Sequence, residues 1–126
     1  MRNHWYFVPT SIFFFIGVLG FADDSVRKIT LETKKIDGAV RWIPEKIETY
    51  PGEKLNITVK HDLDEGFDFH GLFIPALKVT KKIDRHKPET VLVTVPRDLK
   101  PGEYKVGCHF HEKHIAATLI VKLAPK

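Results

Sequence analysis

Apolar side chains recur at every second position along most of the chain beyond residue 25, with polar side chains between them. This alternation, in segments rich in Val, Ile, Phe and Thr, is typical of β-strands that bury one face and expose the other. The alternating positions are Ile29, Leu31 and Thr33; Val40 and Trp42; Leu55, Ile57 and Val59; Phe67 and Phe69; Leu77 and Val79; Val91, Val93 and Val95; Tyr104, Val106 and Cys108; and Ala117, Leu119, Val121 and Leu123. Long helical periodicity is absent, so the pattern predicts an all-β chain.

Turn signals separate these segments at Asp37-Gly38, Pro51-Gly52 and Pro101-Gly102. Short strands with such turns between them are typical of two sheets packed face to face with Greek-key connections. The stretch Ile83–Glu89 is the least patterned and is expected to be a loop. The predicted fold class is therefore an all-β, Greek-key β-sandwich of about seven to eight strands.

The beginning of the chain has a different pattern. Arg2 is the only charged residue before Asp23, and the run IFFFIGVLGF between them has no polar side chain. A basic start, a short apolar stretch and small residues at the cut are features of a secretory signal peptide. The run is shorter than the roughly 20 residues that span a membrane, which makes a retained membrane anchor the less favoured alternative. We predict a signal peptide at residues 1–22, a mature domain at 23–126, and a periplasmic or secreted location.

Length, charge and cysteine content further restrict the number of domains, the class of partner and the state of the thiol. The chain has 126 residues, which is enough for one domain. Its net charge is +4 with both signs interspersed and no basic stripe, so no nucleic-acid partner is expected. Cys108 is the only cysteine and cannot form an internal disulfide. A lone thiol in an oxidising compartment is a liability unless it is buried as an inert side chain or bound to a metal.

Two histidines follow Cys108 at a regular spacing, His111 and His114. Positions three apart on a strand point to opposite faces, so this spacing suits a tight turn after a strand. If residues 110–113 curl into such a turn, the three donors converge. A thiolate with two imidazoles favours copper, zinc or iron over magnesium or calcium.

A fourth donor, His70, lies upstream in the segment FDFHGLFIP, at an expected strand end. In a sandwich, a distant strand end can meet the last hairpin, and the fold would then fix the site. The other histidines of the mature chain, His61, His86 and His109, are expected to be ordinary surface or capped side chains, with His109 pointing away from Cys108.

Three segments carry a resemblance to the cupredoxins, the blue-copper family. They are RWIPEKIETYPGEKLNITV, FHGLFIPALKV and KPGEYKVGCHFHEKHIAATLIV. The resemblance covers roughly Val40 to Leu123, and the ordered set is more specific than any one segment. It implies a cupredoxin-like copper-binding domain at 23–126 with one copper ion per chain.

Carried over from the family, His70, Cys108 and His111 would form a trigonal plane around copper, with a weak axial ligand, usually Met, above it. Met1 is the only methionine, so the mature chain has none, and His114 stands near the usual axial position. A strong axial imidazole should lower the potential and give a green, yellow or red centre, which is similar to the red-copper nitrosocyanins. Glu112 and Glu65 are weaker candidates for an oxygen ligand. A dinuclear copper site needs two bridging thiolates and is disfavoured.

Three functions are compatible with this site. The first is electron transfer, with His111 as the electron exit and Leu72 and Phe73 as candidates for an apolar docking patch. The second is binding and delivery of copper, and the third is a small catalytic copper site, which would need an open coordination position. The first is favoured, an enzyme is less so, and the expected partner of this monomer is a redox protein or a copper donor or acceptor. A membrane contact is expected only through the first 22 residues, if they are uncleaved.

Overall fold

The computed structural model describes residues 25–64 and 68–124. The predicted signal peptide and the predicted strand position Phe67 lie outside the described residues. The described residues form nine strands and one short 3-10 helix. These elements are β1 (Val26–Ile36), β2 (Ala39–Ile43), β3 (Lys46–Thr49), β4 (Lys54–Lys60), β5 (Phe69–Ile74), η1 (Pro75–Leu77), β6 (Val79–Asp84), β7 (Glu89–Thr94), β8 (Gly102–Val106) and β9 (Ala117–Val121).

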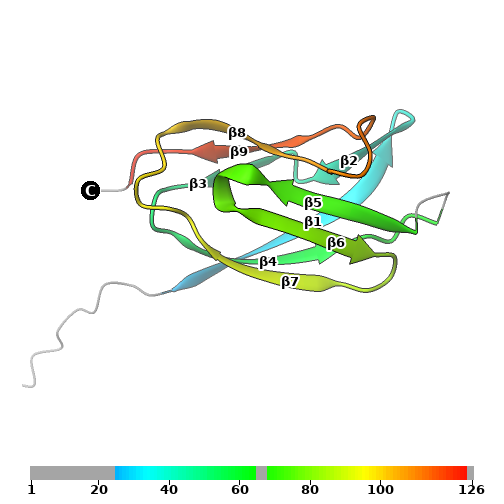
Figure 1. Ribbon diagram of the computed structural model, residues 1–126, viewed down its shortest axis with the longest axis horizontal. Coiled ribbons are helices and arrows are strands. Elements are labelled where there is room, and N and C mark those ends of the chain that lie inside the picture. Colours follow the sequence, from blue (N-terminus) through cyan, green and yellow to red (C-terminus); the bar gives the residue numbers. More distant parts are fainter. Residues whose placement is uncertain (1–24, 65–67, 125–126) are drawn as a thin grey trace, which may run out of the picture.

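The strands form two layers (Figure 1). One sheet has the order β2-β1-β4-β7 and includes a parallel β1–β4 pair. The other layer contains the sheet β3-β9-β8 and the hairpin β5-β6. Two backbone hydrogen bonds of 2.9 Å between Phe73 and Gly107 attach this hairpin to the end of β8. The predicted all-β Greek-key sandwich is confirmed.

The apolar positions of the alternating pattern fill the space between the layers. Trp42 and Leu72, from opposite layers, are 1% and 0% exposed. The buried core also contains Leu31, Ile47, Leu55, Ile57, Val59, Ile74, Ile83, Val95, Val106, Leu119 and Val121. None of the described residues forms a helix long and apolar enough to cross a membrane.

Three expectations from the sequence differ from the structure. The strand count is nine because Pro44, which lacks a backbone N–H, separates β2 from β3, and the two strands join different sheets. Leu77 lies in η1 and not in a strand, with Pro75 at its first turn and Lys78 in a left-handed conformation at its end. The stretch Ile83–Glu89 is not all loop, because β6 runs to Asp84 and β7 begins at Glu89.

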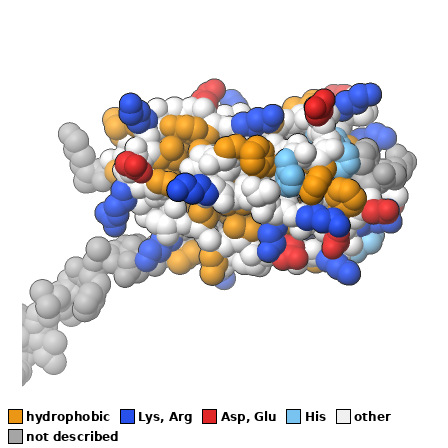
Figure 2. Space-filling model, viewed as in Figure 1, with side chains coloured by type: hydrophobic (Ala, Val, Ile, Leu, Met, Phe, Trp, Pro, Cys, Tyr) orange, Lys and Arg blue, Asp and Glu red, His pale blue; other side chains and the backbone are white. Residues whose placement is uncertain are grey.

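Three parts of the chain meet at one end of the sandwich. There the β1–β2 turn, the start of β5 and the β8–β9 connection come together, while the chain's C-terminal end lies at the opposite end (Figure 1). The space-filling view shows histidine side chains next to hydrophobic ones at this end (Figure 2). We call it the histidine end, and it contains all four predicted ligands.

Candidate metal centre

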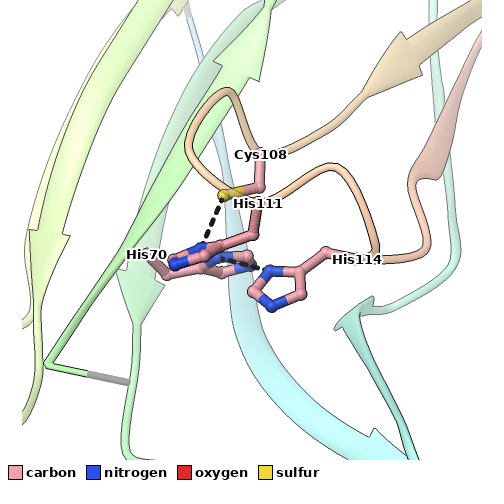
Figure 3. Close-up of side chains that lie close together, drawn as sticks. All are labelled: His70, Cys108, His111 and His114. Atoms are coloured by element: carbon pink, nitrogen blue, oxygen red, sulfur yellow. Dashed lines mark hydrogen bonds between the residues drawn. The ribbon is translucent and has the colours of Figure 1, made fainter. Parts of the chain in front are cut away.

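The four predicted side chains, which come from two distant segments, lie together. His70 is the second residue of β5, whereas Cys108, His111 and His114 belong to the connection between β8 and β9. One ligand atom from each lies within 4.8 Å of every other (Figure 3). The connection closes on itself through a hydrogen bond from the His114 N–H to the His111 carbonyl, 3.2 Å long. The expected tight turn after the Cys108 strand is therefore present.

The distances between donor atoms fit a single metal ion. Cys108 Sγ is 3.5 Å from His111 Nδ1, and the Nδ1 atoms of His70 and His114 are 3.0 Å apart. Nitrogen ligands at about 2.0 Å from an ion and a sulfur ligand at about 2.3 Å stand roughly 3 to 4 Å from one another. These two pairs therefore have the separation expected of ligands on one ion, and the group as a whole lies within 4.8 Å.

His70 is the most deeply buried member of the group, with 0% of its surface exposed. The sequence predicts it at a strand end, and the structure has it as the second residue of β5, facing the core, while Phe69 is only partly buried. The indole of Trp42 stacks on its ring at a centroid distance of 4.5 Å. Its Nε2 is buried and has no hydrogen-bond partner among the residues that the structure describes. A buried imidazole of this kind is well suited to binding a metal through its other nitrogen.

Burial keeps two of the imidazoles neutral. Desolvation, followed by the neighbouring His114, lowers the pKa of His70 from 6.5 to about 3. Desolvation, followed by His111 and His61, lowers the pKa of His114 to about 4. Neutral imidazole is the form that binds metals, so both rings can offer a nitrogen lone pair at neutral pH.

Cys108 is partly buried, and its sulfur accepts a hydrogen bond from the Gly71 N–H at 3.2 Å. This donor comes from the residue next to His70, so the bond ties the two ligand segments together. A Cβ at Gly71 would lie only 2.7 Å from His109 Nδ1 and 2.8 Å from the ring of Phe110. A larger residue at position 71 would require these two rings to move, so glycine allows the segment after Cys108 to pack this closely on β5.

Some predicted neighbours lie outside the group of four. His109 is exposed, as expected, and its ring packs against Phe110 at 3.9 Å. Glu112 is exposed and does not belong to the group, and Glu65 lies outside the described residues. Of the two residues considered for a docking patch, Leu72 is core and Phe73 is partly buried.

The expectation of an ordinary surface or capped side chain is wrong for His61. His61 is 1% exposed, and its Nδ1 lies 2.8 Å from Thr33 Oγ1. The signal was present in the sequence, because His61 continues the inward positions Leu55, Ile57 and Val59 by one further step of two. His86, in contrast, is exposed, and its two ring nitrogens contact Asp62 and Asp64.

A surface hollow of about 350 Å³ lies beside two of the candidate ligands. Its walls are formed by residues 38–40 on one side and by His111, Glu112, Lys113 and His114 on the other. The side chains of His111 and His114 are partly exposed. The group is therefore closed on the His70 side and open to solvent on the side of these two histidines.

The fold is shared with solved copper proteins of low sequence identity. An NMR structure of a copper-binding protein in the apo form matches with a TM-score of 0.57 and 18% identity over 81% of this chain and 93% of that one. The metal-binding domain of the Streptococcus pneumoniae Cu(I)-exporting P-type ATPase, solved with Cu(I), matches with a TM-score of 0.62 and 13% identity over 81% and 91%. The copper nitrite reductase of Nitrosomonas europaea matches with a TM-score of 0.60 and 13% identity over 81% of this chain.

Two of the matched structures are longer than this chain, which covers 45% of the nitrite reductase and 66% of a chain of a heme-copper terminal oxidase. No curated protein sequence matches significantly. A model of the cupredoxin-like domain family matches residues 9–121, nearly the whole chain. With its two-layer fold and its group of one cysteine and three histidines, the chain belongs to the cupredoxin-like domain family.

Proposed function

We propose that this domain binds one copper ion through His70, Cys108, His111 and His114 and acts in electron transfer. The observation that carries the proposal is the convergence of one sulfur and three nitrogen donors within 4.8 Å on a buried scaffold. Copper would supply one-electron redox chemistry at this point. A thiolate with imidazoles suits copper, zinc or iron, and the cupredoxin-like fold favours copper among them.

The scaffold supports a redox role. His70 is packed under Trp42, and the segment that contains Cys108 is bonded to β5 through Gly71 and Phe73. Ligands on two segments that are bonded to each other beside a buried core move little when the charge of the metal changes. A site of this kind needs little reorganisation when it gains or loses an electron.

The fourth donor sets the expected properties of the centre. The imidazole of His114 lies against that of His70, and we assign it the position where cupredoxins usually have a weak axial Met. Imidazole stabilises Cu(II) over Cu(I) more than a thioether does, so we expect a low potential and a green, yellow or red colour. The electron would leave through His111, which is partly exposed, toward a redox partner protein outside the cytoplasm.

Copper binding and delivery is a second candidate, favoured by the hollow beside His111 and His114. This open side gives a copper donor or acceptor access to two of the four ligands without disturbing His70. A delivery protein would release copper through this face.

Redox cycling in the presence of a competing chelator separates the two candidates. The mature domain, residues 23–126, is loaded with one equivalent of Cu(II), reduced, and reoxidised while a Cu(I) chelator is present. An electron carrier retains its copper and regains its visible spectrum over repeated cycles. Loss of copper to the chelator in the first reduced state would contradict electron transfer and support delivery.

A further inference from the structure

The ring of His70 lies against a row of three side chains from the opposite sheet. Thr33 of β1 is aligned with Trp42 of β2. β1 also pairs with β4, and there Glu32 is aligned with Lys60. Continuing this register by one residue places His61 beside Thr33. Because side chains alternate between the two faces of a strand, all three point inward. The exposed fractions are 1% for Trp42, 3% for Thr33 and 1% for His61. These three residues form what we call the His70 floor.

The His70 floor touches the ligand ring at two points. The ring centroids of Trp42 and His61 lie 4.5 and 5.7 Å from that of His70. Trp42 is fixed in turn, because its Nε1–H donates to the carbonyl of Gly107, beside Cys108, at 3.3 Å. His61 is fixed by the bond of 2.8 Å between its Nδ1 and Thr33 Oγ1.

The buried Thr33–His61 pair costs more free energy than an apolar pair would in the same place. The preceding inward residues of β4, Leu55, Ile57 and Val59, are all apolar, and a Val–Leu pair would continue the same core. Burying an imidazole and a hydroxyl instead costs desolvation free energy, which their mutual hydrogen bond only partly offsets. This pair also lies at the point where the sheet meets the metal-ligand cluster.

Metal-binding histidines generally have their ring orientation fixed by surrounding hydrogen bonds and packing. His70 directs Nδ1 toward His114, while its Nε2 is buried without a partner among the described residues. Within the described part of the chain the contact with His114 is on the Nδ1 side only, and no hydrogen bond holds the Nε2 side of the ring. The orientation of that side depends on the rings packed against it. Among the described residues packed against it, His61 is the one fully buried imidazole that is not itself a candidate ligand.

We propose that His61, held by Thr33, is a positioning residue that fixes the ring of His70 and so the direction of its Nδ1 toward the metal. This inference rests on the proposed copper site. It gives the Thr33–His61 pair a role in setting the electronic structure of the centre, although neither residue belongs to the group of four candidate ligands. Thr33 lies in β1 and His61 directly follows β4, in the layer opposite β5.

The test compares copper affinity and the visible and electron-paramagnetic spectra of Cu(II)-loaded variants of the mature domain. His61→Leu replaces the imidazole with an apolar side chain that still fills the core. For this variant we expect a shifted thiolate-to-copper band and about a 10- to 100-fold loss of copper affinity. Thr33→Val preserves the shape of the side chain and removes the hydroxyl, and we expect a shift in the same direction. His61→Gln keeps a polar group within reach of Thr33 and should restore part of the wild-type spectrum.

Thr49→Val is the matched control, because Thr49 is a buried threonine, 3% exposed, whose hydroxyl donates to Glu53 near the opposite end of the sandwich. It should lower the melting temperature and leave the copper spectrum unchanged. Wild-type spectra and affinity in both His61→Leu and Thr33→Val would overturn the inference, and Thr33→Val alone decides if His61→Leu does not fold. A wild-type domain with no thiolate-to-copper band would overturn the proposed function as well.

Discussion

The two ends of the sandwich each contain a buried threonine paired with a titratable side chain, but the two pairs differ in what surrounds them. At the end opposite the histidines, Thr49 donates to Glu53 Oε1 at 2.9 Å, and the same oxygen accepts bonds from Arg27 Nε and Nη2 at 3.2 and 2.7 Å. At the histidine end, Thr33 pairs with His61, next to a His70 ring whose Nε2 has no hydrogen-bond partner among the described residues.

This difference separates a structural polar network from a binding site. The Glu53 oxygen is satisfied by its own neighbours, so the network needs no further ligand. The histidine end instead brings three imidazoles together at a desolvation cost large enough to lower the pKa of His70 to about 3 and of His114 to about 4. Such a costly cluster of lone pairs is stabilised when a cation binds them.

The largest effect is expected when the sulfur is removed from the histidine end. Cys108→Ser should abolish the intense visible absorption of the Cu(II)-loaded domain, because that band arises from charge transfer from thiolate to copper. Absorption spectra at one copper per chain check this. Retention of the band in this variant would show that Cys108 is not a ligand.

A smaller change is expected when the fourth donor is weakened. His114→Met replaces a strong imidazole with a weak thioether, so the copper should move toward the trigonal plane of the other three donors and the spectrum toward that of a blue centre. The reduction potential should rise in the same variant. A spectrum identical to that of the wild type would mean that His114 is not the axial ligand.

The pH dependence of the metal-free domain tests the cost of the histidine end. The pKa values of His70 and His114 lie below the ordinary value of 6.5 in the folded state, so the unfolded chain binds more protons as the pH falls. Their contribution to stability is complete above about pH 6.5 and is lost progressively toward about pH 3 to 4.

Urea unfolding midpoints between pH 7 and pH 4 measure this loss. One equivalent of copper should raise the midpoint at pH 7, because ligand binding to the folded state stabilises it. His114→Met removes one of the two groups and should flatten the pH dependence of the metal-free protein. An equal or steeper loss in this variant would contradict the assignment.

The smallest effect on copper is expected at the opposite end. Glu53→Gln weakens the bonds from Arg27 and Thr49, and the loss of charge-assisted bonds should lower the free energy of unfolding by about 1 to 3 kcal/mol. The copper spectrum and the copper affinity should remain those of the wild type. Chemical denaturation of the metal-free and copper-loaded domains gives both quantities. A shifted copper spectrum would mean that the two ends are coupled, against the comparison drawn here.

The strands were predictable because each one buries a single face. The period-two pattern of β4, for example, marked Leu55, Ile57 and Val59 as inward, and all three are buried. The convergence of Cys108, His111 and His114 was also predictable, because their spacing suits a turn and they are close in the sequence.

The rest of the site depends on pairing across sheets, which local spacing does not reveal. The sequence predicts an ordinary histidine at position 61, because its contacts arise only when β1 places Thr33 beside it and β5 brings His70 next to its ring. The same holds for Gly71, whose importance comes from the close approach of His109 and Phe110 on another segment. A local pattern indicates which face is buried, but not which residues meet there.

Titration of the purified mature domain with Cu(II), followed by visible and electron-paramagnetic spectroscopy, tests the central claim most directly. The account predicts a strongly coloured complex that saturates at one copper per chain, with the signature of a thiolate-bound Cu(II). A colourless protein, or copper bound only weakly and without a thiolate band, would contradict a copper site built from His70, Cys108, His111 and His114.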